Sequence, residues 1–327
     1  MRRHPWLGLL VVLLATSLLA LMLGATVLAP ATVLGALAGT EHDATARLIV
    51  RGIRLPRVIL AVLVGGALGV SGTVLQGTLR NGLAEPYLLG VSGGAAVGAV
   101  LAVGAGVSAP AVIALAAFAG ALVAVAGVLA LARSTGGAGD TRVLLMAGVV
   151  IGAFANASIM VVMAAASPDV ARNALWWMMG SVAAAGWRDV ALLAVSLFVV
   201  GTVLLHQARA LDVLALGADA ADALGVDAAR VGWRFFVLAS LLAASTVAVA
   251  GLVGFVGLIV PHLARSLAGA RARPTLVLAA LAGAALVVAS DLAARTVRAP
   301  AELPLGAVTA LLGVPFFLWR LRRGTGR

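Results

Sequence analysis

Cysteine and lysine are both absent from the 327 residues, and charged residues make up only 11% of them. Without cysteine, the chain can form neither disulfides nor thiolate metal sites. The four histidines (His4, His42, His206 and His262) show no spacing typical of metal ligands. The glycine run at 90–94 lacks the Lys-Ser/Thr pair of a phosphate-binding P-loop. The sequence therefore predicts no metal site, no cofactor, no catalytic centre and no ATP hydrolysis by this chain.

Apolar residues, in contrast, make up 63% of the chain, about 206 residues. A helix needs about 20 apolar residues to cross a bilayer, so these residues could fill roughly ten spans. The formal net charge of +11 comes from 23 arginines scattered between the apolar runs. Scattered arginines are typical of loops that set membrane topology, not of a nucleic-acid-binding face. We expect an all-α polytopic membrane protein with a single transmembrane domain over 1–327 and no nucleic-acid partner.

Uncharged runs delimit the expected spans. They predict spans at 6–29, 58–79, 88–107, 111–132, 143–165, 190–206, 232–250, 255–267, 274–294 and 303–319. The uncharged stretch 235–264 is too long for one span and too short for two full ones. Two crossings with a break near 251–257 place Arg265, Arg271 and Arg273 in the cytoplasm, as the positive-inside rule favours. The model then has ten spans, with both termini in the cytoplasm.

Two short hydrophobic segments, 88–99 and 252–262, are interrupted by glycine, one in each half of the chain. On the ten-span model they are the third and eighth spans, so they cross the membrane in opposite directions. This pattern is typical of inverted repeats, whose broken helices lie near a translocation path. The other glycines favour close helix packing in lipid.

One expected outer loop carries four arginines: Arg47, Arg51, Arg54 and Arg57. Either the positive-inside rule, which is statistical, simply fails here, or the loop forms a basic surface that docks an acidic soluble partner. Arg54 and Arg57 flank Pro56 and would project from one side of a first helical turn.

The acidic residues all fall in expected loops or at span ends, and Asp291 can pair with Arg295 one helical turn away. Ion-driven carriers usually keep ionisable groups at mid-membrane, at a cost of at least about 2.5–3.5 kcal/mol each. The sequence therefore predicts a transport path whose driving force comes from a partner.

The cytoplasmic loop 207–230 is where such a partner could bind. Leucines at helical spacing alternate there with acidic residues, and glycines follow two short helical patterns. The residues concerned are Leu211, Leu214, Leu216, Gly217, Leu224 and Gly225. We expect two short amphipathic helices along the inner membrane surface; the alternative is a merely solvated loop.

From about residue 47 to residue 323 the chain resembles the permease subunit of type II ABC importers, the family that carries iron–siderophores, haem or cobalamin. The motifs that carry the resemblance are RLPR at 54–57, SGTVLQGTLRNGLAEPYLLGVSGGA at 71–95, LLMAGV at 144–149, WWMMGSVAAAGW at 176–187, LALGADAADALGV at 214–226, GFVGLIVPHLAR at 254–265 and AELPLGAVTALLGVPFF at 301–317. Gly82 departs from the pattern, because the family usually has proline there.

The resemblance implies an inverted-repeat fold with ten helices per subunit, in the bacterial inner membrane. A second copy of the chain would complete the path, an ATPase dimer holding ATP and Mg would drive it, and a periplasmic or lipid-anchored binding protein would deliver the substrate. The implied binding-protein docking residues are Arg54, Arg57 and Arg295; the implied path residues are Asn156, Ala157, Ser158 and Met160. The loop helices at 211–226 would couple to the ATPase, and 173–181 resembles a short helix at the outer mouth.

The substrate expected from the resemblance is an iron chelate, either a siderophore or haem, with cobalamin as the alternative. Two alternative functions are compared with the importer hypothesis. An autonomous carrier or channel would transport without ATP, and an intramembrane enzyme would need a nucleophile or metal cluster within the bilayer.

Overall fold

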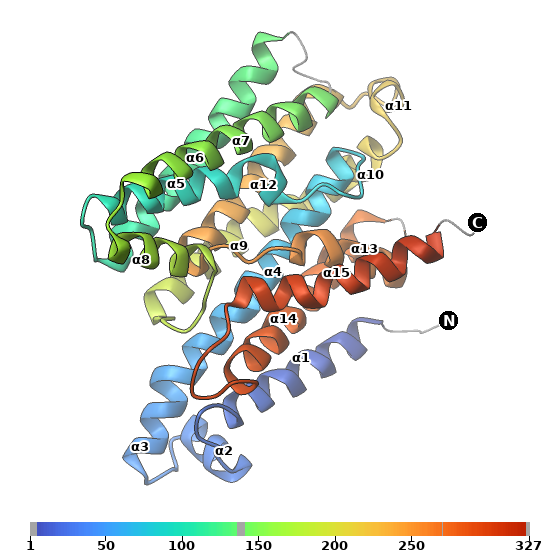
Figure 1. Ribbon diagram of the computed structural model, residues 1–327. Coiled ribbons are helices and arrows are strands. Elements are labelled where there is room, and N and C mark those ends of the chain that lie inside the picture. Colours follow the sequence, from blue (N-terminus) through green and yellow to red (C-terminus); the bar gives the residue numbers. More distant parts are fainter. Residues whose placement is uncertain (1–4, 136–140, 270, 325–327) are drawn as a thin grey trace.

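The computed structural model describes residues 5–135, 141–269 and 271–324, and over these residues it is helical, with no β-strand (Figure 1). The helices are α1 (Pro5–Met22), α2 (Pro30–Ala38), α3 (Ala44–Arg47), a π-helix η1 (Leu48–Arg54), α4 (Leu55–Thr78), a 3₁₀ turn η2 (Pro86–Leu89), α5 (Val91–Gly104), α6 (Pro110–Ser134), α7 (Thr141–Ala165), α8 (Pro168–Met178), α9 (Trp187–His206), α10 (Ala208–Leu214), α11 (Ala218–Ala223), α12 (Ala228–Ala250), α13 (Val256–Ala268), α14 (Ala272–Thr296) and α15 (Leu305–Gly324).

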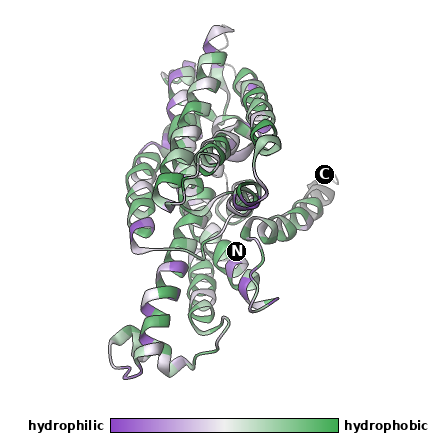
Figure 2. Cartoon of the chain, turned by 60° about the vertical axis from the view of Figure 1, so that its left-hand side comes forward, coloured by the Kyte–Doolittle hydropathy of each residue, from purple (hydrophilic) through white to green (hydrophobic). Residues whose placement is uncertain are grey.

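The described residues include seven helices that are long and apolar enough to cross a membrane. They are α1, the continuous helix 44–78, α6, α7, α9, α12 and α14. Three shorter apolar helices, α5, α13 and α15, complete the set of ten. Figure 2 shows these helices as mostly hydrophobic, with hydrophilic residues gathered mainly near helix ends and connections. The expected all-α polytopic membrane fold is confirmed.

Helix α4 forms the centre of the molecule, since nearly all of it is buried against α14, α12, α13 and α9. Glycines allow these backbones to approach closely. A Cβ on Gly65 would collide with the carbonyl oxygen of Gly283 in α14, and one on Gly72 would collide with that of Gly257 in α13. Because lipid gives helices no hydrophobic reason to associate, small residues at the contact supply the packing.

The prediction of a first span over 6–29 is wrong at its C-terminal end, because α1 stops at Met22. The guanidinium of Arg54 donates hydrogen bonds to the carbonyls of Leu21 and Met22, both at 2.8 Å, and to that of Thr26. These bonds satisfy carbonyl groups that the end of a helix leaves without partners. Pro30 then starts α2, in the position where its fixed φ suits a first turn.

The expected outer loop with four arginines is also wrong, because residues 44–78 form one continuous helix. Asp43 caps its start by accepting a hydrogen bond from the Thr45 N–H at 2.8 Å. The four arginines therefore lie along one helix and differ in burial. Arg47 and Arg51 are exposed, whereas Arg54 and Arg57 are buried.

The helix break expected near 251–257 is confirmed, since α12 ends at Ala250 and α13 begins at Val256. Gly251 has a φ of +66°, and a Cβ there would collide with the carbonyl oxygen of Trp177, so glycine is required. The other expected broken segment divides in the same way, into η2 and α5, with Gly90 at a φ of +82° between them.

Candidate functional site

Three regions carry the residues that the sequence singled out. The first is the arginine end of the molecule, where α4 begins and α14 ends. The second is the coupling end, which carries α10 and α11 and lies at the opposite end of the bundle in Figure 1. The third is α7, together with the two broken segments that lie between these ends.

At the arginine end, Arg57 binds two carboxylates from distant parts of the chain. Its Nε lies 3.1 Å from both carboxylate oxygens of Asp291 in α14. Its Nη1 and Nη2 donate to the two carboxylate oxygens of Glu302, at 2.7 and 2.9 Å. The fork of five N–H donors suits such bidentate contacts. Arg57 thus fastens the start of α4 to the end of α14 and to the connection that leads into α15.

Arg295 completes this cluster. Its Nε lies 3.5 Å from Asp291 Oδ2, which confirms the expected pairing, and its Nη2 donates to the Ala20 carbonyl of α1 at 2.6 Å. Two buried guanidiniums, those of Arg57 and Arg295, therefore share the Asp291 carboxylate, whereas the buried Arg54 binds the carbonyls at the end of α1. The neighbouring Arg57 keeps the pKa of Glu302 below its usual range, because it donates hydrogen bonds to that carboxylate.

The three arginines expected to dock a binding protein are thus brought together, but inside the protein. Each is about 5–6% exposed, and its guanidinium is held by groups of this same chain. The exposed arginines at this end are Arg47, Arg51 and Arg298. The sequence could not reveal this difference, because Asp291 and Glu302 lie 234 and 245 residues from Arg57.

At the coupling end, the structure forms the two short helices that the leucine and glycine pattern predicts. Leu211 and Leu214 of α10 are buried, whereas Leu216 and Leu224 are 66% and 61% exposed. Gly217 and Gly225 have φ values of +116° and +79°, which end α10 and α11. Asp212 accepts a hydrogen bond from the Ala272 N–H at 2.6 Å, so α10 also caps α14. Helix α10 also contacts the end of α4, where Leu211 lies against Gly77, so α10 is packed against two transmembrane helices.

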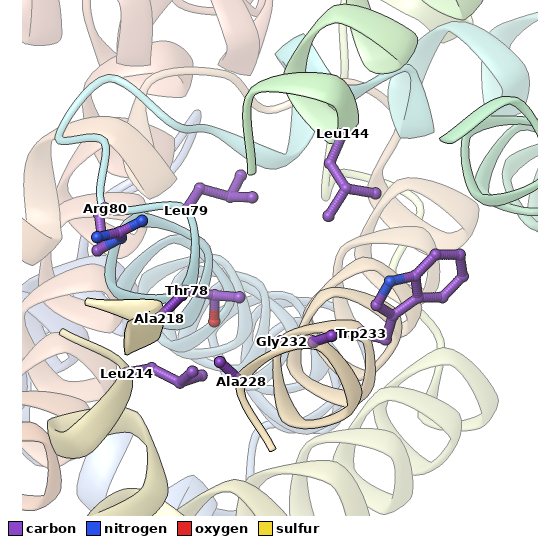
Figure 3. Close-up of a pocket in the computed structure, with 10 residues that line it drawn as sticks. Thr78, Leu79, Arg80, Leu144, Leu214, Ala218, Ala228, Gly232 and Trp233 are labelled. Carbon is purple, nitrogen blue, oxygen red and sulfur yellow. The ribbon is translucent and has the colours of Figure 1, made fainter. Parts of the chain in front are cut away.

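Figure 3 shows the junction beneath these helices. A cavity of about 30 Å³ lies where the ends of α4, α7, α10, α11 and α12 meet. The lining residues include Thr78, Arg80, Leu144, Leu214 and Trp233. This volume holds one water molecule and excludes a larger ligand. The junction is therefore a packed meeting point of five helices and not a binding pocket for a larger ligand.

Trp233 adds a second link at this junction. The guanidinium of Arg133, at the end of α6, lies 4.4 Å from the centroid of the Trp233 ring at the start of α12. This distance is typical of a cation–π contact. Helix α6 is thereby connected to the helix that follows α11.

The two broken segments bind each other through side chains that the sequence reading did not single out. The Glu85 carboxylate accepts a hydrogen bond from the Phe255 N–H at 2.6 Å, and the Tyr87 hydroxyl accepts one from the Val253 N–H at 2.8 Å. Burial raises the pKa of Glu85 to about 7, although the bond from Phe255 opposes this shift. In the sequence, the signal that could have indicated this contact is Glu85 followed by Pro86 at the edge of an apolar segment.

His262 joins the same contact, since its Nε2 lies 2.9 Å from the Gly82 carbonyl oxygen. The contact links α13 to the connection between α4 and η2. Among the residues that the structure describes, no three His, Cys, Asp or Glu side chains gather in a way that could hold a metal ion.

The positions expected to line a path lie in the middle of α7. Asn156, Ala157 and Met160 are exposed, and Met160 is 72% exposed. Ser158 is partly exposed, and its hydroxyl donates to the Phe154 carbonyl within the same helix. Residues 173–181, expected to form a short helix at the outer mouth, correspond to the end of α8 and the turn after it.

The comparisons with known proteins agree with this architecture. The family model described as the FecCD transport family matches residues 11–323. The chain is 43% identical to the cobalamin import system permease protein BtuC of Halobacterium salinarum, covering 85% of this chain and 74% of that protein. It is 42% identical to the hemin transport system permease protein HmuU of Yersinia pestis, covering 83% and 82%.

A solved structure of a metal-chelate type ABC transporter in an inward-facing conformation matches with a TM-score of 0.85, at 28% identity and covering 97% of each chain. Fold and site together define a multi-pass permease of the inner membrane, a transport subunit and not an enzyme. The chain belongs to the FecCD transport family and is a permease of the type II ABC importers.

Proposed function

We propose that this permease imports an iron chelate, a siderophore or haem, by alternating access driven by a separate ATPase. The observation that carries the proposal is a family match over 11–323 to relatives named for hemin and for iron(3+)-hydroxamate import. Cobalamin is the second candidate, because other relatives are named for its import. An autonomous carrier is disfavoured by the family membership of the chain.

The coupling end supports the ATPase assignment. Leu216 and Leu224 are large apolar side chains exposed beside the acidic residues of α10 and α11. Exposed leucines rimmed by polar groups mark protein interaction sites. On this proposal the ATPase dimer, with its ATP and Mg, contacts these leucines, and this chain binds no cofactor of its own.

The exposed faces of α7 and α15 support a homodimer with a path at its centre. Met146, Phe154 and Met160 on α7 and Leu311 on α15 are each more than two-thirds exposed. A second copy of this chain would cover part of these faces. Asn156, Ala157, Ser158 and Met160 would then line a wide path that interacts weakly with a bulky chelate.

Because the three predicted arginines are buried, we assign two different roles in binding-protein docking to the exposed and to the buried arginines. Arg47, Arg51 and Arg298 are positioned to meet acidic groups of the partner first, because they are exposed at the arginine end. The buried arginines support the docking surface indirectly, because they hold the ends of α1, α4 and α14 in place; they are Arg54, Arg57 and Arg295. Both sets remain in the proposed docking region.

Purification of the tagged chain from its native host in mild detergent tests the proposal. We expect a second polypeptide with vanadate-sensitive ATPase activity to copurify. An iron chelate delivered with its binding protein should raise that activity, whereas cobalamin should not. Stimulation by cobalamin alone would shift the assignment to the second candidate. Transport by the chain alone in liposomes without ATP would contradict the importer mechanism.

A further inference from the structure

A second cavity at the coupling end, of about 200 Å³, is separate from the junction shown in Figure 3. It is formed where α9 ends, α10 runs and α14 begins. Its lining residues are Leu205, His206, Ala208, Arg209, Asp212 and Arg273. Nothing in the proposed transport cycle uses this cavity.

The charges in this cavity favour an anion. Arg209 and Arg273 are both exposed, and within the described part of the chain neither takes part in an ion pair. The single carboxylate nearby, Asp212, already caps α14 through the Ala272 N–H. Two guanidiniums therefore face a space that holds one carboxylate. Planar guanidinium groups suit phosphate oxygens, which they bind through paired hydrogen bonds.

The surroundings of the cavity indicate that this anion belongs to a lipid. Helices α9 and α14 both pack against α4, and Leu197 and the Ala280 carbonyl both lie near Gly66. On α9, Val195, Phe198 and Val199 form an exposed apolar stripe that shares a helix face with His206 at the cavity. On α14, Val277 is exposed one turn after Arg273. In a membrane protein such exposed apolar side chains face acyl chains. Arg209 follows the end of α9 and Arg273 lies in the first turn of α14, both beyond these apolar side chains. Arginines at such span ends extend to the headgroup level of the nearer leaflet.

We propose that this cavity binds the phosphate-bearing headgroup of an anionic phospholipid from the leaflet on the α10 side. The acyl chains lie along the exposed stripe of α9, and Arg209 and Arg273 bind the phosphate. Basic pockets between transmembrane helices on the cytoplasmic side are established binding places for acidic headgroups. Because Arg209 belongs to α10, the bound lipid also holds the helix assigned to ATPase coupling. The lipid site itself depends only on the membrane location of the chain.

Native mass spectrometry of the full-length chain, purified in detergent and titrated with lipid, tests the proposal. The probes are dioleoyl phosphatidylglycerol, dioleoyl phosphatidylcholine with the same acyl chains, and inorganic phosphate. The site variant is R209Q/R273Q. The control is R230Q/R234Q, which removes two exposed arginines from the start of α12 and changes the net charge equally. A third variant, R209K/R273K, keeps the charge.

The wild-type chain should bind phosphatidylglycerol in preference to phosphatidylcholine. Each basic residue near an anionic lipid surface contributes about fivefold in affinity, so R209Q/R273Q should lose about 25-fold. R230Q/R234Q should stay within about twofold, because Arg230 already pairs with Asp227 and neither side chain lines the cavity. R209K/R273K should retain most of the affinity. Because this measurement needs no ATPase, it tests the lipid site independently of the transport proposal.

Equal wild-type affinity for the two lipids would overturn the proposal. So would unchanged phosphatidylglycerol binding by R209Q/R273Q, or an equal loss in the R230Q/R234Q control. Displacement of phosphatidylglycerol by the same concentration of inorganic phosphate would assign the cavity to a free anion instead of a lipid.

Discussion

At the residue scale, one acidic side chain is buried against the break that separates two helices. Glu85 is 7% exposed and bonds to the N–H of Phe255, a residue with a φ of +67°. Burial disfavours the charged form of this carboxyl, so its pKa of about 7 lies above the usual value of about 4.5. Between these two pH values the folded chain binds a proton that the unfolded chain releases. Stability from this group is therefore present below pH 4.5 and is lost as the pH rises through about 7.

Glu85→Gln should remove this pH dependence, because glutamine keeps a carbonyl acceptor for the Phe255 N–H and does not ionise. We expect the wild-type chain to melt several degrees lower at pH 8 than at pH 5.5, and E85Q to show a clearly smaller difference. Asp169→Asn, at a carboxylate that is 81% exposed, serves as the control and should behave like the wild type. Equal differences in the wild type and E85Q would refute a raised pKa at Glu85.

At the element scale, the start or end of a helix was predicted well where nearby residues determine it. It was predicted poorly where a residue far away in the sequence determines it. Pro110 starts α6, and the positive φ of Gly217 ends α10, both as expected from local chemistry. The end of α1 was missed because the group that satisfies its carbonyls, Arg54, comes 32 residues later. Burial of Arg57 was missed for the same reason, since a charged residue suggests the surface until its carboxylates are known. The two short helices α10 and α11 were predicted without knowledge of any distant contact, because local leucine and glycine spacing indicates them.

The exposed leucines in the turns that follow these two helices give the prediction at this scale. Leu216→Asp combined with Leu224→Asp places two charges on the apolar contact proposed for the ATPase, so the ATPase should no longer copurify. Leu48→Asp is the matched control, because Leu48 is 65% exposed against 66% for Leu216 but lies at the arginine end. The measurement is the ratio of ATPase to permease after affinity purification. Retention of the ATPase by the double variant, or its loss in L48D, would place the coupling contact elsewhere.

At the scale of the whole molecule, the break between α12 and α13 decides the direction of every later helix. Helix α12 has 23 residues and reaches about 35 Å, whereas α13 has 13 residues and reaches about 20 Å, at 1.5 Å per residue. If the two helices cross the membrane separately, α14 ends on the same side as the start of the helix 44–78. If they crossed as one unit, these two ends would lie on opposite sides, which the ion pair between Arg57 and Asp291 contradicts.

Single cysteines distinguish these arrangements directly, because the native chain has no cysteine that would react in the background. Arg51→Cys and Arg298→Cys replace exposed side chains at the arginine end, and Arg230→Cys replaces an exposed one at the start of α12. In intact spheroplasts, a membrane-impermeant maleimide should label the first two variants, and should label R230C only after permeabilisation. Labelling of R51C but not R298C in intact cells would mean that α12 and α13 make a single crossing. The ten-helix topology would then give way to an odd number of spans, and the carboxyl terminus would lie outside.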